Sequence, residues 1–198
     1  MRHIPTRVRV FFTGLWAKLR RIPSAPSADV VAFLDDLFDR FPFSPAAVGW
    51  MRDHVSVEMR DLDSVHGGGL FYPGQNRVVL NTGQYEAAIH ELAHAWWDTR
   101  RMDEHRDFVE AVVRAADDGD PGFARIGNLA RGYVYGLAEQ GFPGFLRDGN
   151  DWEMFAGLAS GCMADIRLLP PYLRVFFEDL FDLLPLDAAR PERMAPHR

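Results

Sequence analysis

Two histidines and a glutamate in the middle of the chain have the types and the spacing of a metal site. His90, Glu91 and His94 lie in the segment 84–99, QYEAAIHELAHAWWDT, whose residues favour a helix. A helix turns about 100° and rises about 1.5 Å per residue, so the two histidines lie on one face, about 6 Å apart along the axis. The imidazoles can therefore share one metal ion, while Glu91, offset by about 100°, can hold a water bound to it.

A chance match is the alternative, in which both histidines are ordinary core or surface residues. The helix around them is strongly apolar, with the residues Ile89, Leu92, Ala93, Trp96 and Trp97. Three ionisable side chains in such a helix need a partner that offsets their removal from water. A zinc ion is such a partner, so the segment predicts the site of a zinc hydrolase with one zinc ion per chain.

A zinc hydrolase takes a third protein ligand and leaves one position for water. Arg100 stands where a longer motif would place a third histidine. Asp98 lies one turn beyond His94 on the same helix and suits a different role, as acceptor of a hydrogen bond from a ligand imidazole. Glu153, in the first turn of a later apolar helix, is the better candidate for the third ligand.

The first half of the chain predicts two helices, a strand and a hairpin. Ser27 and Ser44-Pro45 are typical helix starts, for helices over 28–40 and from 45 toward 54. Apolar and polar residues alternate over 55–60, which indicates a strand. Two short runs, 70–72 and 77–81, flank a Pro-Gly turn and predict a hairpin that leads directly into the histidine helix. The glycines at 67–69 are expected to let the backbone bend beside another group.

The second half predicts only helices. They are expected over 103–118, 123–140, 152–164 and 172–184. The fold class is therefore α+β, with a small mixed or antiparallel sheet packed on the active-site helix and a helical C-terminal half.

Length and composition indicate one domain. A chain of 198 residues with 47% hydrophobic residues can bury a single core. We expect a basic arm and linker over 1–26, the domain over 27–186 and a frayed tail over 187–198. No apolar run approaches the ~18 residues of a membrane span.

Charge is distributed unevenly. Residues 1–21 hold six basic residues and no acid, so the rest of the chain sums to −12 within a total of −6. An acidic body argues against nucleic acid as a partner. The basic arm is expected to be dispensable for the chemistry, and weak contact of the arm with a membrane surface stays an alternative to simple packing. A cytoplasmic location is favoured over export by this arm.

Cys162 is the only cysteine, so an internal disulfide is excluded. It follows Glu153 by nine positions, about two and a half helical turns, and therefore faces away from the predicted site. We expect a buried, inert cysteine rather than a catalytic thiol.

Taken together, three stretches resemble the gluzincin metallopeptidases, in particular the catalytic domains related to anthrax lethal factor. The stretches are Val65-His66 with Gly69 to Pro73, Ile89 to Asp98, and Asn150 with Glu153, Phe155 and Ala156. The resemblance implies a zincin-like fold, with His90, His94 and Glu153 as zinc ligands and Glu91 as general base. It also shows two departures: Leu146 stands where those relatives have a tyrosine thought to support the oxyanion, and Gly157 where they have a second acid.

Leu146 cannot donate a hydrogen bond to a developing oxyanion. Tyr133, Tyr135 and His66 are the candidates for this donor, with the tyrosines favoured, although either tyrosine taken singly also fits a core position. We therefore expect a zinc-dependent endopeptidase that acts on a peptide or protein, with the strand Leu70, Phe71 and Tyr72 pairing with the extended substrate. The alternatives are a zinc-binding regulatory or protein-binding domain with lost or weak hydrolysis, and a toxin-like effector protease with one protein substrate.

Overall fold

The structure, a computed structural model, describes residues 27–60, 68–81, 83–119 and 150–183. Its elements follow in the order α1 (Ala28–Arg40), α2 (Pro45–His54), β1 (Ser56–Met59), β2 (Gly69–Tyr72), β3 (Arg77–Leu80), α3 (Tyr85–Trp97), α4 (Met102–Asp117), α8 (Asn150–Gly161), the 3-10 helix η2 (Ile166–Leu168) and α9 (Pro171–Arg174). A small sheet precedes α3, and the described residues after it form helices, turns and one isolated β-bridge at Phe181. The predicted α+β class is confirmed.

Both N-terminal helices begin where their capping serines predict. Ser27 Oγ accepts the backbone N–H of Val30 at 3.4 Å, and Ser44 Oγ accepts that of Ala47 at 3.1 Å. Each bond satisfies a donor that the first helical turn leaves without a partner. Pro45 follows at the first position of α2, where its missing N–H costs nothing.

The sheet has three strands in the order β1-β3-β2, so β2 is an edge strand. β2 and β3 form the predicted antiparallel hairpin, and β1 runs parallel to β3 on its other side. The hairpin turn requires left-handed backbone at two positions, which Gly74 and Asn76 supply with φ of 75° and 45°. The sheet is thus of the mixed kind.

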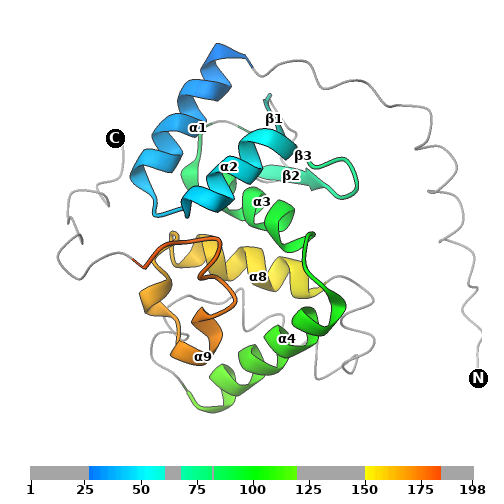
Figure 1. Cartoon of the computed structure of the whole chain (residues 1–198), viewed down its shortest axis with the longest axis vertical. Helices are drawn as coiled ribbons and strands as arrows, with labels where there is room; N and C mark the ends of the chain where they lie inside the picture. Colours follow the sequence, from blue (N-terminus) through cyan, green and yellow to red (C-terminus); the bar gives the residue numbers. More distant parts are fainter. Residues whose placement is uncertain (1–26, 61–67, 82, 120–149, 184–198) are drawn as a thin grey trace, which may run out of the picture.

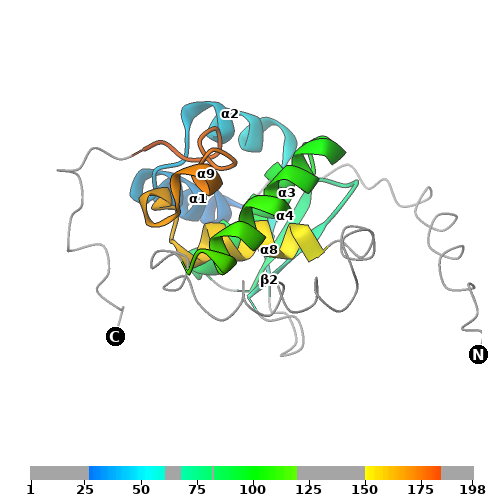
Figure 2. The same ribbon diagram turned by 90° about the horizontal axis from the view of Figure 1, so that it is seen from below.

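Helix α3 lies between the sheet and the C-terminal helices. In Figure 1, the sheet and α1 and α2 lie on one side of α3, and α8, α4 and α9 lie on the other. The view from below in Figure 2 superimposes α4, α8 and α3, so these helices are stacked in successive layers. Helix α3 therefore contacts the edge strand on one side and α8 on the other.

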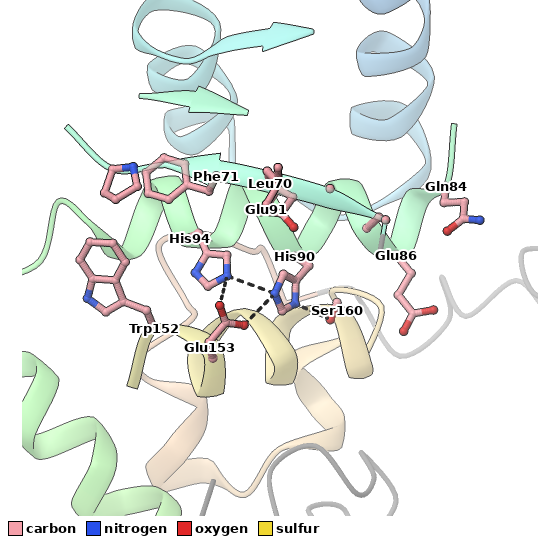
Figure 3. Close-up of a pocket in the computed structure, with 14 residues that line it drawn as sticks. Leu70, Phe71, Gln84, Glu86, His90, Glu91, His94, Trp152, Glu153 and Ser160 are labelled. Atoms are coloured by element: carbon pink, nitrogen blue, oxygen red, sulfur yellow. Dashed lines mark hydrogen bonds and ion pairs between the residues drawn. The ribbon is translucent and has the colours of Figure 1, made fainter. Parts of the chain in front are cut away.

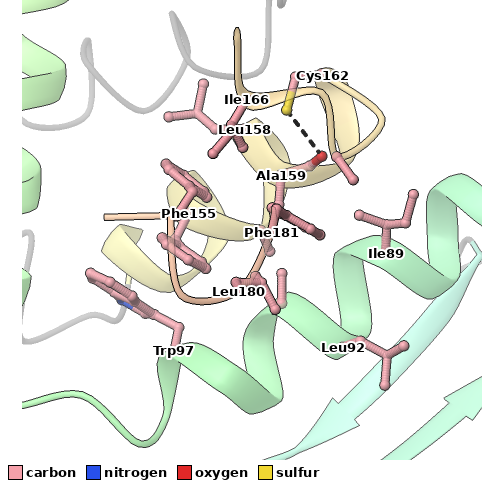
Figure 4. Close-up of a cluster of buried hydrophobic side chains, with 14 of the residues drawn as sticks. Ile89, Leu92, Trp97, Phe155, Leu158, Ala159, Cys162, Ile166, Leu180 and Phe181 are labelled. Carbon is pink, nitrogen blue, oxygen red and sulfur yellow. Dashed lines mark hydrogen bonds between the residues drawn. The ribbon is translucent and has the colours of Figure 1, made fainter. Parts of the chain in front are cut away.

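The core between α3 and α8 is built from stacked aromatic rings. Trp97 of α3 lies on Phe155 of α8, with ring centroids 4.2 Å apart, and Phe155 lies on Phe177 at 4.3 Å. Figure 4 shows these helices meeting along Ile89, Trp97, Phe155 and Leu158. Each of these side chains is at most 1% exposed, so the two helices share one continuous core.

The C-terminal segment differs from its prediction. A helix was expected over 172–184, but α9 ends at Arg174 and the chain continues to Leu180 in turns. This part of the chain pairs with the residues just before α2. Ser44 N–H donates to Leu180 O at 2.9 Å, and Phe181 forms an antiparallel β-bridge with Phe43. These long-range contacts outweigh the local preference for helix, which apolar spacing alone had indicated.

Several predicted features lie outside the described residues: the arm and linker over 1–26, the helix over 123–140 and the tail from 187. Among the described residues, no helix has the length and apolar character needed to span a membrane.

Candidate metal centre

The two histidines of α3 point from one face of the helix toward the same point. The Nε2 atoms of His90 and His94 are 3.1 Å apart, and their rings are nearly perpendicular, at 83°. This arrangement follows from the four-residue spacing, which places both side chains on one face. Figure 3 shows both imidazoles directed from α3 toward α8.

Glu153 reaches the same point from the first turn of α8. Its Oε2 lies 3.3 Å from Nε2 of His90, and its Oε1 lies 3.4 Å from Nε2 of His94. One ligand atom from each of the three residues lies within 4.8 Å of the others. The structure thus brings the three predicted ligands together.

The distances between these atoms fit a zinc ion. Zinc binds nitrogen and oxygen at about 2.0–2.2 Å in a tetrahedron, whose corners are then about 3.3–3.6 Å apart. The two Nε2 atoms are 3.1 Å apart, close to that edge length, and each lies 3.3–3.4 Å from a different carboxylate oxygen of Glu153. Two neutral imidazoles and one carboxylate are also a ligand set that zinc hydrolases use. With one ligand atom from each residue within 4.8 Å of the others, the group could hold a metal ion such as zinc.

Hydrogen bonds and charges within the site shift the pKa of Glu153 and of His90 in opposite directions. The hydrogen bonds from His90 and His94 hold the pKa of Glu153 far below its usual range. Burial acts to lower the pKa of His90, but its hydrogen bond to Glu153 and the charge of Glu91 outweigh that effect and raise it. A carboxylate that stays ionised beside two imidazoles supplies the negative charge a divalent cation needs.

Glu91 lies beside the metal group and beneath the edge strand. It is only 7% exposed, and burial raises its pKa, against the opposing charges of His94 and His90 and the backbone N–H of Phe71. A Cβ on Gly69 would come within 2.6 Å of Cγ of Glu91, so the strand can lie this close only because residue 69 is glycine. The bend expected of the glycine run is thus a close approach of β2 to the predicted base.

An open cavity of about 670 Å³ lies over the three ligands and Glu91. Leu70 and Phe71 of β2, two of the three residues predicted to bind substrate, line it. Tyr72, the third residue predicted to bind substrate, does not line the cavity. The guanidinium of Arg77 lies over its ring, with Arg77 Cζ 4.1 Å from the ring centroid.

Sequence reasoning missed several other residues of this cavity, among them Glu86, Trp152 and Ser160. Glu86 precedes His90 by one turn of α3, and Ser160 follows Glu153 by two turns of α8. Helical spacing from the predicted ligands was the signal that could have found both. Trp152 and Phe71 flank one end of the cavity, and Glu86 lies at the other (Figure 3).

The hydrogen bond predicted for Asp98 is not formed. Asp98 is the C-cap of α3, and its carboxylate accepts the backbone N–H of Gly74 in the hairpin turn. Among the described residues, Nδ1 of His94 is buried without a hydrogen-bond partner. Nδ1 of His90 lies 3.5 Å from Oγ of Ser160. The hairpin turn competes for Asp98, a contact that spacing along one helix could not show.

Of the remaining candidates, the predicted oxyanion donors lie outside the described residues and Cys162 lies within them. Tyr133, Tyr135, His66 and Leu146 lie outside the described residues, so the oxyanion donor stays a prediction. Cys162 is buried, as predicted; its Sγ donates to the carbonyl of Ala159 at 3.4 Å, and burial raises its pKa to about 12 (Figure 4). Such a thiol is not a nucleophile at neutral pH.

The comparisons with known proteins name no family for this chain, so the assignment of the site rests on the geometry described above. Neither the models of protein families, nor the curated proteins, nor the solved structures match the chain.

Proposed function

We propose that the protein is a zinc-dependent endopeptidase of the gluzincin type, with a zincin-like fold. One observation carries the proposal: His90, His94 and Glu153 converge within 4.8 Å at the floor of a cavity whose wall is an edge strand. Bound by these three residues, a zinc ion supplies Lewis-acid activation of a water and of the scissile carbonyl.

Glu91 is the general base in this proposal. It follows His90 directly, so helical geometry offsets it from the ligand face while keeping it beside the reacting water. Its buried carboxylate, with a raised pKa, accepts the proton of the attacking water and passes it to the leaving amide nitrogen.

The edge strand supports an extended peptide as substrate. Alternate residues of an antiparallel strand direct their backbone groups away from the partner strand. Gly68 O accepts from Asn81 N–H at 2.9 Å, so the backbone of Gly69 and Phe71 faces away from β3, toward the side of Glu91. An unfolded segment can add to such an edge as a further strand, which carries its peptide bonds past the metal group.

The test compares zinc content and proteolysis in the wild type and in Glu91→Gln. We expect one zinc ion in both proteins, measured by elemental analysis, and a loss of casein hydrolysis by about 10²- to 10⁴-fold in the variant. Glu110→Gln is the matched control, because Glu110 is exposed on α4 and removed from the site. Wild-type hydrolysis in Glu91→Gln would show that another group is the base. Stoichiometric zinc with no turnover in the wild type would instead identify a zinc-binding domain without hydrolysis.

A further inference from the structure

A buried carboxylate with no part in the proposed chemistry lies two residues before Glu153. Asp151 is 1% exposed, and its Oδ2 accepts two hydrogen bonds. Trp97 Nε1 donates at 3.0 Å and His105 Nδ1 at 2.6 Å. His105 lies on a helix rich in charged residues, yet it is itself only 5% exposed.

These contacts join three elements at a single oxygen atom. Trp97 belongs to the last turn of α3, three residues after His94, while His105 comes from α4 and Asp151 from the first turn of α8. The rings of Trp97 and His105 also lie together, with centroids 4.6 Å apart. The helix that carries two ligands is thus tied directly to the helix that carries the third.

The chemistry of a buried carboxylate makes this tie selective for one arrangement. Apolar contacts, such as the stack of Trp97 on Phe155, do not select one partner atom, because hydrophobic burial is non-directional. A buried carboxylate that loses its donors is strongly disfavoured, and so are the donors left behind. A slip of α8 by one residue moves it by about 1.5 Å, enough to break both hydrogen bonds.

We propose that Asp151, held by His105 and Trp97, is a positioning residue that fixes α8 so that Glu153 meets His90 and His94. The role rests on the metal site proposed above. Asp151 touches neither metal nor substrate; it acts through the placement of the third ligand.

A pair of variants at His105 tests the proposal. His105→Asn keeps an N–H donor at the position of Nδ1, whereas His105→Leu removes it and keeps an apolar shape. We expect His105→Leu to bind zinc about 10-fold to 100-fold more weakly, measured by competition with a chelator, as is usual when a partner behind a ligand is lost. His105→Asn should restore most of the affinity.

Cobalt substitution supplies a readout that a general loss of stability does not move. The visible absorption of Co²⁺ reports the number and geometry of its ligands, so a displaced Glu153 should change the band intensities in His105→Leu and in Asp151→Ala. Ser44→Ala is the matched control: it removes a buried cap of α2 and the 2.6 Å hydrogen bond from Ser44 Oγ to Asp179 O, far from the ligands in the chain. It should lower the melting temperature and leave the cobalt spectrum unchanged.

The outcomes separate this proposal from the proposed function. Wild-type zinc affinity and an unaltered cobalt spectrum in His105→Leu would overturn the positioning role and leave the peptidase proposal standing. A wild-type protein that binds neither metal would overturn both. If Asp151→Ala does not fold, the two His105 variants and Trp97→Phe, which removes the other donor, decide the question by the same measurements.

Discussion

Helices α3 and α8 meet at the metal group, but they contribute to it in different ways. Helix α3 supplies two of the proposed ligands and the proposed base within five consecutive residues, and their mutual placement follows from the helix itself. Helix α8 supplies the third proposed ligand, whose place depends on how the whole helix packs against α3. The first contribution is local, and the second is tertiary.

This difference locates the sensitive part of the site. Once α3 forms, His90 and His94 are correctly spaced without help from the rest of the fold. Glu153 is about half-exposed, and it reaches both imidazoles only while α8 keeps its position along the aromatic core and the Asp151 contacts. Changes in α8 and behind it should therefore affect metal affinity, whereas changes around Glu91 should affect the rate.

Glu153→Ala is expected to have the largest effect on the α8 contribution. The variant leaves two imidazoles without the third ligand and without its negative charge. Loss of a residue that only supports a ligand costs about 10-fold to 100-fold in metal affinity, and the loss in Glu153→Ala should be larger. Equilibrium dialysis followed by metal analysis measures the loss, with circular dichroism as the check of folding. Retention of stoichiometric zinc would show that another group supplies the third donor.

Gly69→Ala should slow hydrolysis without weakening metal binding, because it disturbs Glu91 and not the three ligands. A Cβ at this position meets Glu91 at 2.6 Å, so either the strand or the carboxylate must move. Misplacement of a catalytic group by about 1 Å can cost about 10²-fold in rate, and we expect a fall of this order in kcat with zinc affinity unchanged.

Gly49→Ala is the matched control for Gly69→Ala. A Cβ on Gly49 meets nothing within 4 Å, and the residue lies in the exposed face of α2. The change should therefore leave the rate unaltered and stabilise the protein by up to about 1 kcal/mol, the helix preference of alanine over glycine. Equal rates in both variants would show that β2 does not constrain the base.

Cys162 gives the smallest expected effect, at the far end of α8 from Glu153. Its raised pKa, about 12, means that the thiol stays protonated until the pH is far above neutral, and at pH 8 only about 1 thiol in 10⁴ is ionised. A thiol reagent should label the native protein very slowly between pH 7 and 9 and label it fully after denaturation. Rapid labelling of the native protein would show that this end of α8 opens.

The sequence by itself determined the local features of the protein. The spacing of His90 and His94, the serine caps at Ser27 and Ser44, and the Pro-Gly turn each act within a few residues, so periodicity and capping rules predict them. Helical spacing from Glu153 predicted that Cys162 faces away from the site, and the usual burial of a free cysteine predicted that it is buried. The α+β class resulted from adding such local predictions together.

Only the tertiary structure decided the features that depend on distant partners. Helical spacing cannot show that Asp98 is taken by Gly74, or that Asp151 binds Trp97 and His105, because these contacts join segments that pack only in the folded chain. The chain past Arg174 turns instead of continuing as a helix for the same reason, since its backbone pairs with the segment before α2. Glu153 combines both cases: its position in an apolar helix marked it as a candidate, and its place beside the histidines depends on long-range packing, whose energy no local pattern records.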